Sequence, residues 1–155
     1  MRATTLLNRV LKLEGVTVVA VESDQLAGSG PVVVKVALRQ RRLACPLCDF
    51  TTRTGYDQRV VDSRWRHLDL GGRQCWLVMR RRRLTCPEHG VITQGVPFAR
   101  AGSGFTRDFE DLTVWLTTRA DKTTVSTFVR VAWRTVGAII TRVWADVEAI
   151  HDRFA

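Results

Sequence analysis

The hydrophobic positions of the first forty residues follow two different periods. Between residues 4 and 13 they recur every three or four residues, which predicts an amphipathic helix that ends before Gly15. Residues 16–21 and 32–38 are dominated by valine and predict two strands. The stretch 27–31 between them, Ala-Gly-Ser-Gly-Pro, has the composition of a turn. The pattern therefore indicates a helix followed by a β-hairpin.

The stretch 45–92 predicts a second, small β unit. Residues 65–70 and 73–84 are strand-like, and Gly71-Gly72 between them suits a two-residue hairpin turn. Within the second of these strands Cys75 alternates with Leu77 and Met79 on one face, so we interpret Cys75 as a core residue. The stretch Gly102-Ser103-Gly104 that follows is the best candidate for a linker.

After residue 104 the period becomes helical. The spacing predicts one helix over residues 106–120 and a shorter one that begins near Thr123 or Thr124, either of which can serve as its N-cap. A longer third helix carries apolar residues at steps of four and three: Val136, Ile140, Val143, Val147 and Ile150. A short helix, a brief turn near Ala132–Trp133 and a longer helix are typical of a helix-turn-helix. An ordinary three-helix bundle without a ligand is the alternative.

Together these elements predict an α+β fold in three segments. Residues 1–40 form the N-terminal helix and hairpin, packed with the segment that follows. Residues 41–100 form a small β module, and residues 105–155 form the three-helix unit.

The formal net charge of +9 is concentrated in the middle of the chain. Residues 39–100 hold thirteen arginines and five acidic residues, whereas residues 101–155 hold seven side chains of each sign. A general bias towards arginine would enrich the whole chain, so it does not explain this distribution. We therefore expect the middle third to bind a polyanion.

Membrane and secreted classes fit the sequence poorly. No stretch approaches the ~20 apolar residues of a membrane span, and the N-terminus, with Arg2 and Arg9, makes a poor signal peptide. We expect a cytoplasmic protein without a membrane partner. Four cysteines in such a protein indicate a metal site or buried thiols before disulfides.

Two cysteine-containing pairs have the spacing of metal ligands. Cys45-Pro-Leu-Cys48 and Cys86-Pro-Glu-His89 offer three thiolates and one imidazole, a closed tetrahedral set for structural zinc. The 37 residues between the pairs leave room for a β-hairpin, as in a zinc ribbon. The alternative is four unrelated residues, with Cys45 and Cys48 as a redox pair, but such a pair normally opens a helix in a βαβ context. His67 and His151 have no companions at ligand spacing.

Arginines lead into both pairs. If the pairs share one ion, these arginines come within one small surface, and guanidinium groups bind phosphate in a bidentate manner. Consecutive residues of a strand alternate faces, so not all of them can reach one ligand. A charged, solvated sheet edge is the alternative. The candidate phosphate contacts are Arg41, Arg42, Arg80, Arg81, Arg82 and Arg83.

The helical segment has a basic centre between acidic flanks. Residues 122–142 contain four cations and no acid. The N-terminal end of the third helix is where base contacts are expected in a helix-turn-helix. The candidate DNA contacts in this segment are Lys122, Arg130, Arg134, Thr135, Ala138 and Arg142.

The order of these motifs resembles the N-terminal part of bacterial insertion-sequence transposases of the ISL-three type. The resemblance rests on four stretches: Cys45–Cys48, His67–Arg73, Arg82–Cys86 and Val131–Gly137. It implies a zinc ribbon, then a helix-turn-helix, then a large DDE catalytic domain. His89 stands where a cysteine is usual in this ribbon, a replacement that tetrahedral zinc tolerates.

The sequence ends at Ala155, where such a transposase would enter its catalytic domain, so we expect no enzymatic activity and carry over no catalytic carboxylate. The main hypothesis is a zinc-containing protein of the bacterial nucleoid that binds double-stranded DNA at the terminal repeats of an insertion element. Its partners would include a second copy of itself or a full-length transposase. A zinc-stabilised protein-interaction module and a truncated, non-functional remnant are the alternatives.

Overall fold

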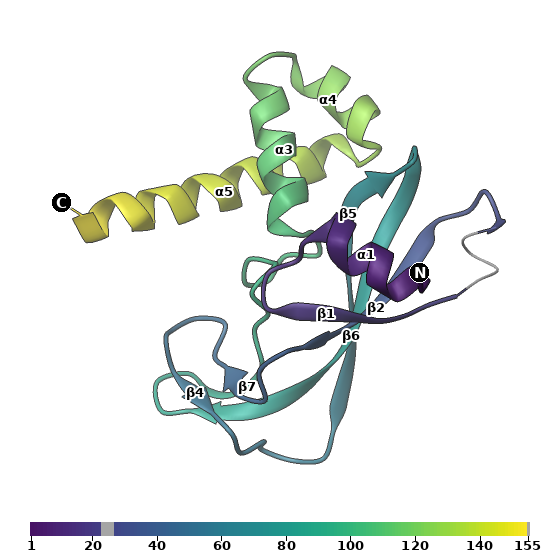
Figure 1. Ribbon diagram of the computed structural model, residues 1–155. Coiled ribbons are helices and arrows are strands. Elements are labelled where there is room, and N and C mark those ends of the chain that lie inside the picture. Colours follow the sequence, from purple (N-terminus) through teal and green to yellow (C-terminus); the bar gives the residue numbers. More distant parts are fainter. Residues whose placement is uncertain (23–26, 155) are drawn as a thin grey trace. The chain divides into compact units, whose positions relative to one another are not determined.

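Helices and strands occur in the order that the hydrophobic pattern predicts, and the α+β class is confirmed. The computed structural model describes residues 1–22 and 27–154 and divides into two units, Met1–Thr106 and Arg107–Ala155 (Figure 1). Ala155, where the predicted helical segment ends, lies outside the described residues.

The first unit begins with helix α1 (Ala3–Leu11), strand β1 (Val16–Val21) and strand β2 (Val32–Leu38). Helix α1 ends two residues earlier than expected because Lys12 adopts a left-handed conformation, with φ 46°. The two strands coincide with the predicted ones and pair antiparallel, so the predicted hairpin is confirmed.

Strands β5 (Val60–Leu70) and β6 (Arg73–Cys86) form the long hairpin of the same unit. Gly71 and Gly72 make its turn with φ 56° and 76°, values that favour glycine, as the sequence predicts. Strand β5 begins five residues before the predicted start because Val60 already pairs with Arg82.

Parallel pairing of β2 with β6 joins the two hairpins into one sheet of order β1-β2-β6-β5. Strand β7 (Gly90–Thr93) pairs with the end of β6, and the two-residue strands β3 (Leu43–Ala44) and β4 (Thr51–Thr52) pair with each other. The module around Cys45 and Cys86 therefore lies at the C-terminal end of β6.

One face of this sheet carries the main core of the first unit. Val34, Cys75 and Leu77 are fully buried there. The rings of Trp65 and Phe98 pack edge to face, with their centroids 5.0 Å apart. The burial of Cys75 confirms it as a core residue, and the same burial raises the pKa of its thiol to about 11. His67 is buried too, with Nδ1 2.8 Å from the Thr106 hydroxyl.

The second unit consists of helices α3 (Arg107–Thr117), α4 (Lys122–Val129) and α5 (Trp133–Phe154). The predicted N-cap of α4 is wrong. Asp121, and not Thr123 or Thr124, caps the helix, because its carboxylate accepts hydrogen bonds from the backbone N–H and hydroxyl of Thr124. The turn between α4 and α5 contains Arg130 in a left-handed conformation, with φ 57°.

The predicted apolar stripe of α5 is only partly buried. Val136 and Val143 face the core of the unit as predicted, but Ile139 takes the buried position expected for Ile140, which is only partly buried. Val147 and Ile150 are 39% and 47% exposed. The reason is length: α5 has 22 residues and α3 only 11, so the C-terminal half of α5 extends beyond α3 (Figure 1).

None of the helices in the described part of the chain combines the length and the apolar content that crossing a bilayer requires.

Candidate metal centre and nucleic-acid interface

The two ligand pairs lie in two hairpin turns that face each other. Cys45–Cys48 lies in the turn between β3 and β4, closed by the hydrogen bond from the Cys45 N–H to the Phe50 carbonyl. Cys86–His89 lies in the turn between β6 and β7, where Gly90 has a φ of 70°. A hydrogen bond from the N–H of Gly95 to the carbonyl of Ala44 ties the two hairpins together.

Gly95 favours this approach. A Cβ at that position would lie 3.0 Å from Cα of Pro46, inside the first knuckle. Because residue 95 has no side chain, the segment that follows β7 can lie directly against the first ligand pair.

The four side chains meet with the spacing that tetrahedral zinc requires. Sγ of Cys48 lies 3.5 Å from Sγ of Cys86, and Nδ1 of His89 lies 3.6 Å from Sγ of Cys45 and 3.5 Å from Sγ of Cys86. Zinc bonds of about 2.3 Å to sulfur and 2.0 Å to nitrogen give tetrahedral edges of roughly 3.5–3.8 Å. All four ligand atoms lie within 4.8 Å of one another, so the donor set fits a structural zinc ion.

The thiols of the set differ in their acidity. Burial raises the pKa of Cys86, but the hydrogen bonds with His89 and with the backbone of Glu88 and His89 lower it to about 6. For Cys48 a backbone hydrogen bond from Phe50 lowers the pKa, while burial and the neighbouring cysteines raise it to about 11. A thiolate at Cys86 and a divalent cation beside it are therefore mutually stabilising.

Little apolar core holds this end of the unit together. Its buried residues are Leu43 and Leu84 and the ligands Cys45 and Cys86, with Phe50 and Ile92 packed at the margin. Because so small a cluster buries little surface, metal binding has to supply much of the local folding free energy.

The run of four arginines on β6 divides between two faces, as the strand alternation predicts. Arg81 donates to the Ser63 hydroxyl and the Gln94 carbonyl, and burial lowers its pKa. Arg83 forms an ion pair with Asp57, which raises the pKa of Arg83 and lowers that of the carboxyl group. Both guanidinium groups are thus engaged within the fold.

The other two arginines of the run face a different surface. Arg80 is highly exposed, and Arg82 is half-buried, with its backbone N–H bonded to Oε1 of Gln94. Arg41 and Arg42, which lead into the first ligand pair, are exposed as well, and Nε of Arg42 donates to the Thr51 hydroxyl at 3.0 Å.

Helix α5 presents an exposed stripe opposite its buried face. The buried positions Val136, Ile139 and Val143 lie on one side of the helix, and the positions about half a turn away step by four, three and four residues. Small side chains follow the first arginine, so another surface can approach the backbone closely. This stripe consists of Arg134, Ala138, Thr141 and Ala145, all of which are exposed.

A lysine from α4 is held against the start of α5. Nζ of Lys122 lies 3.4 Å from the centroid of the Trp133 ring. A Cβ on Gly137 would lie only 2.7 Å from that nitrogen, so the missing side chain makes room for the lysine. Cation–π attraction and this gap therefore place the Lys122 charge beside the first turns of α5.

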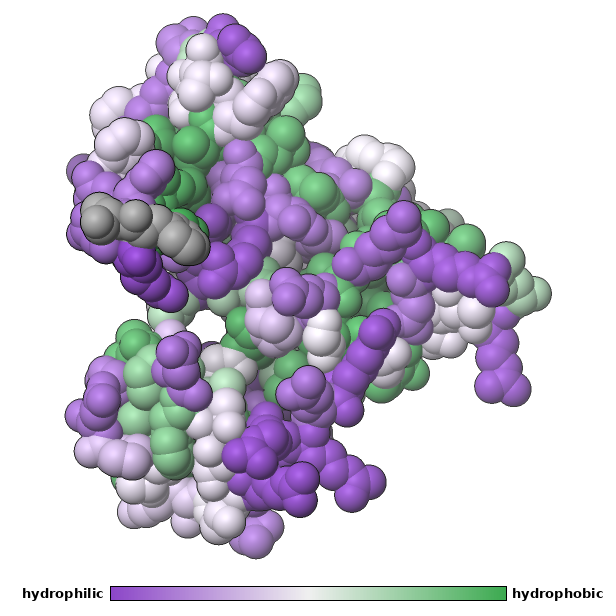
Figure 2. All heavy atoms as spheres, turned by 60° about the vertical axis from the view of Figure 1, so that its left-hand side comes forward, coloured by the Kyte–Doolittle hydropathy of each residue, from purple (hydrophilic) through white to green (hydrophobic). Residues whose placement is uncertain are grey.

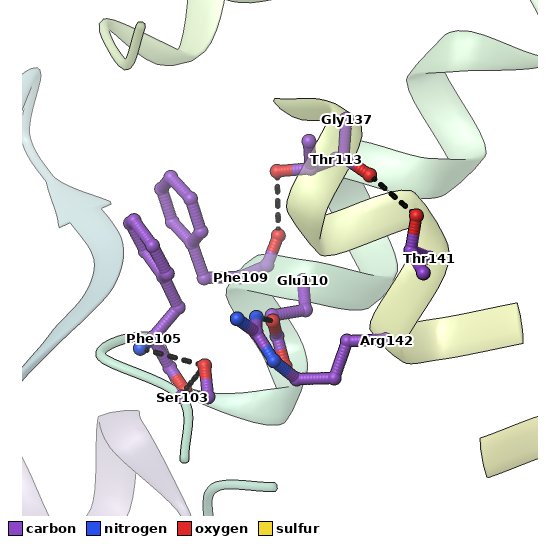
Figure 3. Close-up of polar contacts among 8 residues, drawn as sticks. All are labelled: Ser103, Phe105, Phe109, Glu110, Thr113, Gly137, Thr141 and Arg142. Carbon is purple, nitrogen blue, oxygen red and sulfur yellow. Dashed lines mark hydrogen bonds and ion pairs between the residues drawn. The ribbon is translucent and has the colours of Figure 1, made fainter. Parts of the chain in front are cut away.

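Arg142, by contrast, stabilises the bundle. Figure 3 shows its guanidinium paired with Glu110 of α3. The side chain of Glu110 is fully buried. Arg130 is exposed at the turn before α5, and Thr135 is half-buried on the helix itself. The structure thus gathers Lys122, Arg130 and Arg134 near the N-terminal end of α5 and gives Arg142 a partner within the unit.

Sequence reasoning missed several residues that belong to these surfaces. Ala145 extends the exposed stripe of α5, and the helical spacing of four from Thr141 was the available signal. Lys35 and Arg64 lie on the same face of the first sheet as Arg80, which only the pairing of β2 and β5 with β6 reveals. Hydrophilic groups cover much of the face seen in Figure 2, with hydrophobic side chains visible between them.

Comparison with known proteins matches two segments to two domains. Residues 41–89 match the zinc-finger of transposase IS204/IS1001/IS1096/IS1165, and residues 95–144 match the helix-turn-helix domain of transposase family ISL3. The first segment contains all four ligands, and the second contains the α3–α5 region up to Trp144.

Two curated relatives are similar over most of the chain. Each is a transposase for insertion sequence element IS1557 from Mycobacterium tuberculosis, from strains CDC 1551 / Oshkosh and ATCC 25618 / H37Rv. Each is 39% identical over 135 residues, which is 86% of this chain and 30% of the relative. The chain therefore spans about a third of the length of these relatives. No solved structure matches it.

The fold and the site define a zinc ribbon followed by a helix-turn-helix, and these two domains indicate DNA binding. The chain is similar to the part of ISL3-type transposases that holds the zinc finger and the helix-turn-helix. The predicted family resemblance and the predicted structural zinc are thereby confirmed.

Proposed function

We propose that the protein recognises the terminal repeats of an insertion element in double-stranded DNA, with α5 as the recognition helix. The single observation that carries this proposal is the exposed stripe of α5, in which Arg134 is followed by Ala138, Thr141 and Ala145. A helix with small side chains along one face can enter a major groove, and an arginine near its start can bond the O6 and N7 atoms of guanine.

The surrounding charges suit the phosphates on either side of such a groove. Lys122, held by Trp133, and Arg130 flank the start of α5. In the first unit the exposed arginines Arg41, Arg42 and Arg80 offer further sequence-independent contacts. In this proposal the chain recognises the repeats at the nucleoid and has no strand-cleaving role of its own.

The experiment is a gel-shift titration of zinc-loaded protein with a terminal-repeat duplex and a scrambled duplex of the same composition. We expect tighter binding to the repeat. Arg134→Ala should lower the affinity for the repeat by about tenfold or more, the value of one bidentate base contact of ~1–3 kcal/mol. Arg119→Ala, which removes an exposed arginine from the loop after α3, is the matched control and should bind like the parent. Equal affinity for the two duplexes would contradict site-specific recognition.

A second candidate function is favoured by the exposed apolar side chains of α5. Trp144 is 64% exposed, and Val147 and Ile150 continue the same end of the helix. Such residues suit contact with a second copy or with a full-length transposase. The salt dependence of the binding affinity distinguishes the two functions. Binding to phosphates weakens steeply as the salt concentration rises, whereas an apolar contact between proteins does not.

A further inference from the structure

A groove opens in the first unit where β2 separates from β6. The two strands pair in parallel only as far as Lys35 and Val78, whereas β6 continues to Cys86. Beyond this point residues 36–43 form one wall and residues 78–82 the other, and the cavity between them has a volume of about 710 Å³. The splaying of one strand pair therefore creates a site that no zinc ligand and no residue of α5 lines.

The floor of the groove is apolar and rigid. Val36, Leu43 and Met79 line it and are themselves at least nine-tenths buried, so the core fixes their positions. Leu38 and Val78 add to the same surface. An apolar floor of this kind gains free energy by removing a flat, weakly polar group from water.

The rim of the groove is cationic. Four basic side chains line it: Lys35, Arg64, Arg80 and Arg82. Among the described residues that line it, Asp62 is the one carboxylate, and its contact with Nε of Arg80, at 3.4 Å, joins two side chains that are 82% and 78% exposed. Such an exposed pair is weak, so Arg80 remains available to a stronger anion.

Two further features strengthen the positive rim. Cζ of Arg64 lies 3.9 Å from the centroid of the Trp76 ring, which restrains this guanidinium at the edge. The exposed Arg41 and Arg42 lie between the lining residues Gln40 and Leu43. These two arginines lie in the same segment as the lining residues without lining the groove themselves.

The apolar floor and the cationic rim together favour one class of ligand. The cations require a polyanion, and the arginine-rich rim suits phosphate. A duplex keeps its bases stacked inside and would leave the apolar floor in contact with water. A single strand, in contrast, can place its phosphates on the rim and turn its bases onto the floor.

We propose that this groove binds single-stranded nucleic acid, with the phosphates on Lys35, Arg64, Arg80 and Arg82 and the bases against the apolar floor. The proposal shares its class of ligand and one phosphate contact, Arg80, with the proposed function. It otherwise concerns another surface and another form of nucleic acid, and Arg64 belongs to the groove alone as Arg134 belongs to α5 alone, so each proposal can fail without the other.

The test measures the binding of a fluorescent 15-mer of thymidine to the full zinc-loaded chain between 50 and 200 mM salt. An abasic strand of equal length and charge is the second probe. We expect a slope of log affinity against log salt of about −3, from four phosphate contacts at roughly −0.7 each. The double variant Arg64→Ala/Arg80→Ala should reduce that slope to about half and weaken binding roughly tenfold. The abasic strand should bind the parent protein several-fold more weakly than thymidine does.

Arg2→Ala/Arg9→Ala is the matched control. It removes the same charge from the N-cap residue of α1 and from α1 itself, and neither position lines the groove. Equal loss of affinity in both double variants would overturn the assignment to the groove, and equal affinity for the abasic strand would overturn the role of the floor. Tighter binding of polyglutamate of matched charge would assign the groove to an acidic peptide instead. Arg134→Ala should leave thymidine binding unchanged, which separates this site from the recognition of duplex repeats.

Discussion

Replacing Cys86 with serine is expected to release the zinc ion and to unfold the end of the first unit that carries both knuckles. The thiolate is one of four ligands, and the surrounding cluster of Leu43, Leu84 and the cysteines is too small to hold the two hairpin turns together alone. Zinc-finger peptides derive ~10–16 kcal/mol from their metal, so losing it outweighs the stability of a small module. Metal analysis should find one zinc per parent chain and almost none in the variant. Amide hydrogen exchange should show lost protection at residues 43–52 and 84–93, with α3–α5 retained.

Cys75→Ala is the control for this prediction. It removes a thiol that is fully buried in the sheet core and is not one of the four ligands. Its stability should fall because a core atom is lost, but its zinc content should stay at one per chain. A Cys86→Ser protein that keeps its zinc and its exchange protection would contradict the tetrahedral site.

The second large effect is expected from Arg142→Met, which leaves the fully buried carboxylate of Glu110 without its cation. Breaking a buried pair from one side generally costs about 3–5 kcal/mol, and the partial exposure of Arg142 places this case near the lower end. Urea denaturation followed by the helical circular-dichroism signal should show the helical unit destabilised by about 3 kcal/mol.

Arg107→Met provides the matched comparison in the same unit. Its ion pair with Asp146, at 3.1 Å, joins side chains that are 43% and 32% exposed, so its loss should cost under about 1 kcal/mol. The double variant Glu110→Leu/Arg142→Met removes both charges and should recover most of the stability lost by Arg142→Met alone. If Arg142→Met and Arg107→Met were equally mild, the buried pair would not stabilise the bundle.

The metal centre could be predicted from the sequence because its ligands lie in local turns. The spacing of two residues within each pair, with proline after the first cysteine of each pair and Gly90 after His89, determines each knuckle almost by itself. The two hairpins could be predicted for the same reason, because Gly71-Gly72 and the valine-rich strands are recognised without knowledge of any distant partner.

What the sequence could not supply were the non-local contacts. The ion pair of Glu110 with Arg142 joins residues 32 positions apart, so a cation that helical spacing placed among the DNA contacts stabilises the bundle. The apolar repeat of α5 likewise continues to Ile150, but only the length of α3 decides where its burial ends. The parallel pairing of β2 with β6, and the groove beyond it, arise from strands far apart in the chain.

The claim that α5 reads DNA is tested most directly by titrating the ¹⁵N-labelled, zinc-loaded protein with the terminal-repeat duplex and following each backbone amide by NMR. The account predicts that the largest shifts fall on Arg134, Ala138, Thr141 and Ala145 and on the start of α4 around Lys122. It also predicts that a scrambled duplex perturbs these amides less. Shifts confined to the first unit, or identical shifts with both duplexes, would contradict the assignment of α5 as the recognition helix.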